Sequence, residues 1–144
     1  NHTDIYSINI TDASTKRLTF DGGRYGLMIS DSTLIYTKLK KGLWQKDINS
    51  EQVGNSAIGG NIFNTLHAWT YDQGHIFYQK VFDDHYQLVA FDIENKVQKP
   101  LVRLPLNSIS KTDSITYVAG KDRLVYTRSS FPQANIKMIE SDNN

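Results

Sequence analysis

Short runs of apolar and aromatic residues, separated by polar breaks, recur along the whole chain. The clearest example is residues 75–93, where apolar runs at residues 76–78 and 88–91 flank a polar break that contains Asp83 and Asp84. Runs this short, rich in β-branched and aromatic residues, indicate strands, and a turn-prone break between two of them predicts an antiparallel hairpin. This segment therefore predicts two paired strands.

The same pattern predicts strands, and no helix, elsewhere in the chain. The stretch nearest to the spacing of an amphipathic helix is residues 58–66, but its Gly59-Gly60 pair favours a loop. In the first predicted strand, Tyr6, Ile8 and Ile10 form the more apolar face and Ile5 lies on the opposite side. The predicted strands are residues 4–10, 17–20, 26–30, 34–38, 43–48, 53–58, 67–71, 75–79, 86–93, 100–104, 114–118, 124–128 and 136–140.

Three of the predicted strands repeat at a long interval. Aligning LIYTK, HIFYQ and LVYTR places Ile35, Ile76 and Val125 in register, at spacings of 41 and 49 residues, each followed by an aromatic residue. A period of about 40–50 residues with four short strands in each unit is typical of β-propeller blades. One four-stranded sheet cannot bury both of its faces, so blades stack on one another around an axis.

The repeat predicts a single all-β domain, residues 1–144, that is a fragment of a larger β-propeller. Complete four-stranded antiparallel blades are expected at residues 26–58 and 67–104, and partial blades at residues 4–20 and 114–140. The first partial blade supplies third and fourth strands, and the last lacks a fourth strand. Because propellers close with about 4–8 blades, we expect a longer protein or a partner chain, such as a second copy, to complete the ring. An open stack or sandwich of antiparallel sheets is the alternative arrangement.

Six aromatic residues are interpreted as the core between blades. They are Tyr36, Trp44, Trp69, Phe77, Tyr78 and Phe91. The alternative is a ligand-binding aromatic patch, formed by those of the six whose strand position faces outward.

Composition disfavours several classes of function. The 16 Lys and Arg residues nearly balance the 15 Asp and Glu residues, which disfavours binding to nucleic acid or to an anionic membrane surface. The absence of Cys excludes disulfides, thiolate metal sites and a cysteine nucleophile. No apolar run approaches the roughly 20 residues that cross a bilayer, so the sequence predicts no membrane-spanning helix within it.

The histidines and a cluster at residues 83–85 could carry chemistry, but their spacing favours a structural role. His2, His67, His75 and His85 form no pair at the spacing of an HExxH motif. His67 and His75 begin adjacent predicted strands, so they could approach each other. Asp83-Asp84-His85 could bind a cation, but at a hairpin tip these residues more simply solvate the turn.

Two further segments resemble functional motifs in part. Residues 54–58 (GNSAI) approach the GxSxG nucleophile elbow, but isoleucine stands where the second glycine is needed and no helix pattern follows. Lys38, Lys40 and Lys41 form a basic cluster near Trp44, which is typical of a hairpin tip that discourages edge pairing. We therefore predict no catalytic, cofactor-binding or metal-binding residue and no enzymatic activity.

The strand sequences resemble WD40-like, TolB-type β-propeller repeats. The resemblance is carried by RLTFDGG, GLMISDSTLIYTK, GLWQKDI, HIFYQ, LVAFDI and DRLVYTR followed by NIKMIE. Asp47 and Asp92 match the aspartate at the end of the third strand in that repeat, and Arg17-Leu18-Thr19 matches its ending. The SPDG turn of the family is degenerate here, at residues 30–32, 71–74 and 119–122.

The second half of the chain is more specifically similar to the C-terminal propellers of bacterial winged-helix transcriptional regulators of the CadC/ToxR type. This resemblance implies a non-catalytic sensory or protein-interaction domain on the periplasmic side of the inner membrane, joined through a membrane helix to a DNA-binding domain outside this sequence. It implies a protein partner or small ligand at the channel face, and no nucleic acid, since no helix-turn-helix pattern is present. The alternatives are the propeller of a prolyl-oligopeptidase-type hydrolase and a stand-alone periplasmic scaffold like TolB.

Overall fold

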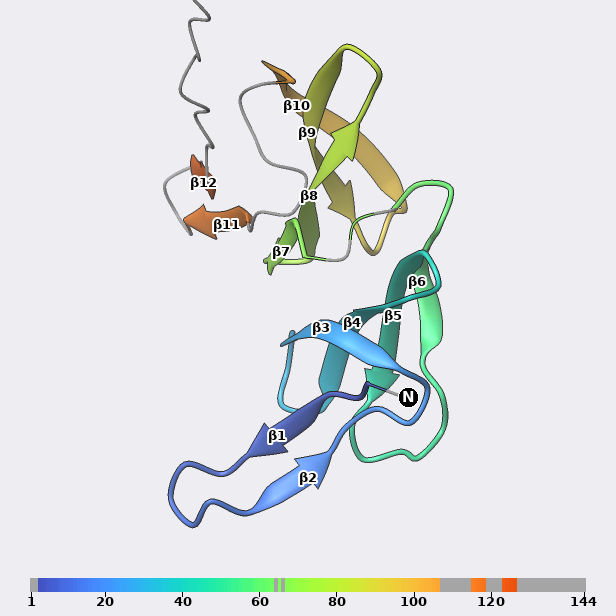
Figure 1. Cartoon of the computed structure of the whole chain (residues 1–144), viewed down its shortest axis with the longest axis vertical. Coiled ribbons are helices and arrows are strands. Elements are labelled where there is room, and N and C mark those ends of the chain that lie inside the picture. The colour runs from blue at the N-terminus through green and yellow to red at the C-terminus, as the bar shows by residue number, and fades with distance from the viewer. Residues whose placement is uncertain (1–2, 64, 66, 107–114, 119–122, 127–144) are drawn as a thin grey trace, which may run out of the picture.

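The computed structural model describes residues 3–63, 65, 67–106, 115–118 and 123–126, and every regular element in these residues is a β-strand (Figure 1). All strand pairs are antiparallel. The all-β prediction is therefore confirmed for the described residues. Every predicted strand up to residue 128 overlaps a strand of the structure, and the strand predicted at residues 136–140 lies outside the described residues.

Each sheet is built from strands that are consecutive in the chain. A two-stranded sheet of β1 (Tyr6–Ile8) and β2 (Thr15–Arg17) comes first. Two four-stranded sheets follow: β3 (Gly23–Met28), β4 (Thr33–Lys38), β5 (Gly42–Asp47) and β6 (Asn55–Gly59), then β7 (Trp69–Asp72), β8 (His75–Val81), β9 (His85–Asp92) and β10 (Val97–Pro105). The last described sheet pairs β11 (Ile115–Val118) with β12 (Arg123–Tyr126). Within a four-stranded sheet we number the strands first to fourth in chain order.

The two four-stranded sheets pack face to face through one buried core. This core is formed by Ile35, Leu43, Ile58 and Phe63 on one side and by Trp69, Ile76, Tyr78, Val89 and Phe91 on the other. Aromatic rings join the two sides, since Tyr25 meets Trp69 edge-on at 5.1 Å between centroids and Phe63 lies 5.0 Å from Tyr78. Such tilted and edge-on pairs are the geometries that aromatic rings favour. Of the six aromatics expected in the core, Trp44 and Phe77 are only partly buried.

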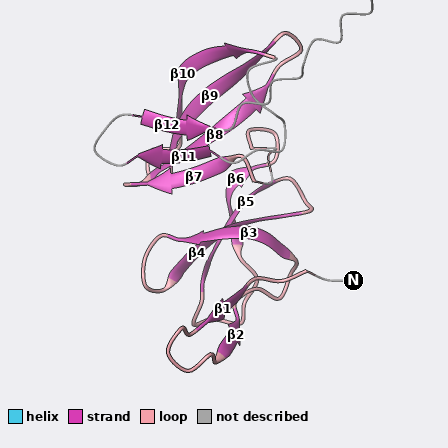
Figure 2. Cartoon of the chain, turned by 60° about the vertical axis from the view of Figure 1, so that its left-hand side comes forward, coloured by secondary structure: helices cyan, strands magenta, loops and turns pink. Residues whose placement is uncertain are grey.

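The remaining face of each four-stranded sheet is covered in part by a two-stranded sheet or its flanking residues. Leu34 and Tyr36 of β4 pack with Leu18, next to β2, and with Ile5, next to β1. On the far side, Leu88 of β9 belongs to a cluster that includes Leu124 of β12, and β11 lies alongside β7 and β8 (Figure 2). The order of the sheets in the stack is therefore their order in the chain.

The structure corrects the register in which the repeated strands were aligned. Ile35 of β4 and Ile76 of β8 lie in the same core between the two sheets, so they point toward each other's sheet. The side chains that face the preceding sheet are instead Leu34, Ile76 and Leu124. Because neighbouring side chains of a strand point to opposite faces, the correction is a shift of one residue in β8. The repeated segments then become TLIYTK, HIFYQK and RLVYTR, with their tyrosines 42 and 48 residues apart.

The hairpin β1–β2 has the same turn as the hairpin β9–β10. Asn9 Oδ1 accepts a hydrogen bond from the Thr11 amide at 2.9 Å, and Asp92 Oδ1 accepts one from the Glu94 amide at the same distance. Four residues after each acceptor the backbone φ is positive, 57° at Ala13 and 58° at Lys96. By this turn β1 is the equivalent of β9, the third strand of its sheet.

The predicted apolar face of the first strand is exposed. Tyr6, Ile8 and Ile10 are 59%, 62% and 97% exposed, and Ile5 on the other side packs with Leu18. Counting from the shared turn, Tyr6 and Ile8 are equivalent to Val89 and Phe91, which face the preceding sheet. Among the described residues no sheet packs on this face of β1, which accounts for the exposure of its side chains.

Candidate binding surfaces

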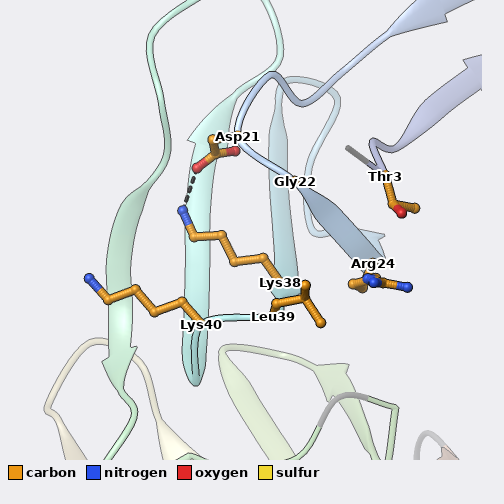
Figure 3. Close-up of a pocket in the computed structure, with 7 residues that line it drawn as sticks. All are labelled: Thr3, Asp21, Gly22, Arg24, Lys38, Leu39 and Lys40. Atoms are coloured by element: carbon orange, nitrogen blue, oxygen red, sulfur yellow. Dashed lines mark hydrogen bonds and ion pairs between the residues drawn. The ribbon is translucent and has the colours of Figure 1, made fainter. Parts of the chain in front are cut away.

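One end of the stacked sheets carries a basic pocket. Antiparallel neighbours reverse direction at every turn, so the β2–β3 connection and the β4–β5 turn lie at the same end of their sheet. The pocket between them has a volume of about 260 Å³ (Figure 3). It is lined by Thr3, Asp21, Gly22, Arg24, Lys38, Leu39 and Lys40, so three of its side chains are cationic and one is anionic.

Asp21 and Trp44 hold Lys38 in place at this pocket. The Asp21 carboxylate forms an ion pair with Lys38 Nζ and accepts a hydrogen bond from the Tyr36 hydroxyl at 2.9 Å. Lys38 Nζ also lies 3.5 Å from the centroid of the Trp44 ring, within range of a cation–π interaction. The Asp21 and Lys38 side chains are each only 13% exposed. Burial, reinforced by the Asp21 carboxylate, raises the pKa of Tyr36, so its hydroxyl remains a donor.

Arg24 and Lys40 are the exposed cations of the pocket. Both are exposed residues, and they extend to either side of Leu39 (Figure 3). Lys40 Nζ lies 5.4 Å from the centroid of the Trp44 ring. Among the described residues neither of them belongs to an ion pair. An exposed arginine and an exposed lysine that form no ion pair can bind a carboxylate or phosphate group.

A larger, mostly apolar groove of about 820 Å³ lies on the face of the β7–β10 sheet that points away from β3–β6. Its apolar lining consists of Phe77, Leu88, Ala90, Leu101, Val102, Leu104 and Leu124. Asp72, Gln73, His75 and Lys99 add polar groups. Leu101 and Val102 are 42% and 43% exposed, so part of this lining is open to solvent.

The hairpin tip between β8 and β9 forms a small polar cluster. The Phe82 amide donates to the His85 carbonyl oxygen at 2.9 Å and closes the turn. Asp84 lies 2.6 Å from His85 Nδ1 and 2.5 Å from a guanidinium nitrogen of Arg103 on β10. The hydrogen bond with His85, together with the charge of Arg103, lowers the pKa of Asp84. Because Asp84 is 68% exposed, these contacts position a solvated turn, in agreement with the sequence interpretation.

The structure separates His67 from His75. Strands β7 and β8 are antiparallel and His75 pairs with Asp72, so the start of β8 lies beside the end of β7. The expectation that these two histidines approach each other is therefore wrong, because the starts of neighbouring strands meet only in a parallel pair. The His67 ring lies 5.9 Å from Tyr25, and His75 Nδ1 lies 3.0 Å from the Gln73 carbonyl oxygen.

No group of three or more His, Cys, Asp or Glu residues is placed to hold a metal ion within the part of the chain that is described, which does not include His2. Residues 54–58, which resemble a nucleophile elbow in sequence, do not form one in the structure. Ser56 lies within strand β6 and pairs with Trp44, whereas the elbow requires a turn between a strand and a helix.

Sequence reasoning found the lysines of the basic pocket but missed Asp21 and Arg24. These two residues follow the β1–β2 hairpin, and only the fold brings them beside Lys38. The one local signal was Asp21-Gly22, a break at which Gly22 adopts a φ of 95°. Of the lysine cluster, Lys41 does not line the pocket.

Comparison with known proteins identified no relative: no protein-family model, curated protein or solved structure matches the chain. The described strands and loops contain no helix long and apolar enough to cross a membrane.

Proposed function

We propose that the chain is a section of a β-propeller that binds a partner or ligand and does not catalyse a reaction. The supporting observation is the direction in which the sheets stack. Leu34, Ile76 and Leu124 occupy the same position in the second strands of three successive units, and each faces the preceding sheet. In a propeller every blade turns the same face toward the blade before it, so the stack can continue around an axis. In a sandwich of two sheets related by a local twofold axis, the same face of both sheets would point into the shared core.

The basic pocket is the site that we propose for ligand binding. Lys38 is held by Asp21 and Trp44, so Arg24 and Lys40 are available to a ligand. The guanidinium of an arginine matches the planar geometry of a carboxylate, and a nearby lysine adds a second charge. The ligand class is therefore anionic, either a small carboxylate or phosphate compound or an acidic segment of a protein.

The cellular setting that we propose rests on the resemblance of the strand sequences. In that setting the chain belongs to the periplasmic, sensory part of a membrane-anchored transcriptional regulator. Its membrane helix and its DNA-binding domain would lie outside the present sequence. Ligand occupancy at the pocket would then be the signal that the rest of the protein transmits.

The ligand pocket is tested by titrating the ¹⁵N-labelled chain with inorganic phosphate, citrate and a glutamate-rich peptide in separate experiments. The amide signals of residues 21–24 and 38–41 are expected to shift saturably with at least one of these probes, and less so at high salt. The double variant Arg24→Glu/Lys40→Glu should abolish the shifts. Lys16→Glu, an exposed lysine on β2, is the matched control and should leave them unchanged. Absence of saturable shifts with all three probes, or equal shifts in the double variant, would refute the pocket.

A further inference from the structure

The two ends of the stack present complementary apolar surfaces. At the N-terminal end, the hairpin β1–β2 exposes Tyr6 and Ile8 on the face that points away from the β3–β6 sheet. At the other end, the β7–β10 sheet presents the apolar groove. The β1–β2 hairpin and the β7–β10 sheet, which carry these surfaces, lie at opposite ends of the stack (Figures 1 and 2).

The groove matches a surface that is already filled between the two four-stranded sheets. There, Ile35, Leu43 and Ile58 of the β3–β6 sheet form one core with Val89 and Phe91 of the third strand β9. The strand pairings give the equivalent positions one sheet later. Leu43 pairs with Ile58 across β5 and β6, and Leu88 pairs with Val102 across β9 and β10.

In the corrected register the equivalent of Ile35 is Phe77. In the filled core, Ile35, Leu43 and Ile58 contact the third strand of the next sheet. Their equivalents in the β7–β10 sheet are Phe77, Leu88 and Val102, and all three line the groove. The groove has the shape and chemistry to take a third strand that carries two apolar side chains at alternate positions.

The hairpin β1–β2 is a strand pair of that kind. Its turn matches the β9–β10 turn, which makes Tyr6 and Ile8 the equivalents of Val89 and Phe91. Val89 and Phe91 are 1% and 3% exposed, whereas Tyr6 and Ile8 are 59% and 62% exposed. The hairpin thus carries the side chains of a buried third strand without a surface to bury them.

We propose that the β1–β2 hairpin of a second copy of the chain docks in this groove, with Tyr6 and Ile8 against Phe77, Leu88 and Val102. In both four-stranded sheets the third strand pairs with the second strand. The same placement sets β1 of the second copy beside β12, which pairs only with β11 among the described residues. Strands β11 and β12 of one copy and β1 and β2 of the next then form a four-stranded sheet, in which β1 takes the third-strand position that was predicted for residues 136–140, a segment outside the described residues.

This contact joins two different surfaces, so each added copy leaves one hairpin and one groove free. Head-to-tail contacts of this type continue until they close into a ring or extend into a filament. The contact uses neither Arg24 nor Lys40, so it stands or falls independently of the proposed ligand pocket.

The test compares a hairpin variant, Ile8→Lys, with a groove variant, Val102→Lys, by analytical ultracentrifugation. Both side chains are exposed in the single chain, at 62% and 43%, so each variant is expected to keep its fold, which far-UV circular dichroism checks. The unmodified chain should assemble beyond a dimer as its concentration rises. Each variant alone should be monomeric, because every contact needs one intact hairpin and one intact groove.

The mixture of the two variants gives the decisive result. The groove of the Ile8→Lys copy and the hairpin of the Val102→Lys copy are both intact, so the mixture should form a dimer of one copy of each and stop there. Val53→Lys, which changes an apolar residue that is 64% exposed and lines neither surface, should assemble like the unmodified chain. A mixture that stays monomeric, normal assembly of Ile8→Lys or Val102→Lys alone, or an unmodified chain that is monomeric at every concentration overturns the proposal. The last outcome would mean that the groove is covered within one chain.

Discussion

Tyr36 and Tyr78 occupy equivalent positions in successive sheets, but only the Tyr36 hydroxyl donates to a carboxylate. Tyr36 donates to Asp21 at 2.9 Å, whereas the buried Tyr78 hydroxyl has the Gln98 side chain near it but forms no hydrogen bond of regular geometry among the described residues. Both residues are almost fully buried, at 0% and 1% exposed. Burial raises the pKa of Tyr78 to about 12. One position of the repeat therefore anchors the basic pocket in one sheet and only fills the core in the next.

Removing the two hydroxyl groups should have different effects on stability. Tyr36→Phe leaves the Asp21 carboxylate without one of its donors and should lower the free energy of unfolding by about 1–3 kcal/mol. Tyr78→Phe removes a buried hydroxyl that forms no hydrogen bond of regular geometry, so it should change the free energy of unfolding by less than about 0.5 kcal/mol or increase it. Urea denaturation of both variants measures the difference. Equal losses would contradict the assigned hydrogen bond.

Gly54 should not tolerate a side chain. A Cβ atom at this position would lie 2.5 Å from the Tyr36 hydroxyl oxygen and 2.9 Å from the Gln45 carbonyl oxygen. Gly54→Ala is therefore expected to destabilise the fold by about 1–3 kcal/mol, because a core with no spare room must shift to accommodate it. Gly59→Ala is the matched control, since its new Cβ would meet only the flexible Asn61 side chain. In thermal denaturation, the melting temperature of Gly54→Ala should fall well below that of the unmodified chain, and that of Gly59→Ala should stay close to it.

The equivalence of β1 and β9 predicts a contrast between Ile8 and Phe91. Phe91 lies in the core between the two four-stranded sheets, so Phe91→Ala should lower the free energy of unfolding by about 3–5 kcal/mol. Ile8 is exposed in the single chain, so Ile8→Ala should change it by less than about 0.5 kcal/mol. Denaturation is measured at a protein concentration low enough to prevent assembly. A large loss for Ile8→Ala under those conditions would show that the hairpin packs within its own chain.

Asp4 should make the fold sensitive to acid. Burial opposes ionisation of this carboxyl, but hydrogen bonds from Gly22, Thr19 and Arg17 outweigh it and lower the pKa of Asp4. A carboxyl group with a lowered pKa in the folded state stabilises the protein above the pKa of the unfolded chain, about 3.9, and this stabilisation is lost as the pH falls through the lower, folded value.

The variant Asp4→Asn isolates this effect. It should be less stable than the unmodified protein at pH 7, and the difference should shrink as the pH falls below about 4. Chemical denaturation at a series of pH values measures the difference directly. A difference that is constant down to the lowest pH at which the chain folds would rule out the Asp4 carboxylate as its source.

The positions of the strands were predictable from the sequence, but the faces of two of them were not. Strand β8 has apolar residues at three consecutive positions, Ile76, Phe77 and Tyr78, so alternation does not select the face that points to the preceding sheet. Tyr6 and Ile8 carry the pattern of a buried face, but burial requires a neighbouring sheet, and local sequence does not say whether one is present. A better guide to register was the tyrosine followed by Thr or Gln and then Lys or Arg, at residues 36–38, 78–80 and 126–128.

The basic pocket was predictable only in part. Lys38 and Lys40 stand out because they are close together and near Trp44 in the sequence. Asp21 comes from the connection between β2 and β3, and nothing in its local sequence marks it as the partner of Lys38. Its role follows from the turn at Gly22 and from the pairing of Gly23 with Lys38, which bring the two side chains together.

The direction of stacking is the central claim, and methyl–methyl nuclear Overhauser effects test it most directly. In a chain with labelled Ile, Leu and Val methyl groups, contacts should connect Ile35 and Ile76 through their shared core and connect Leu124 with Leu88. Leu34 should contact Leu18 and Ile5 and show no contact with Ile76. Contacts between Leu34 and Ile76 would mean that the β3–β6 sheet presents its opposite face, and the account of sheets stacked in one sense would be wrong.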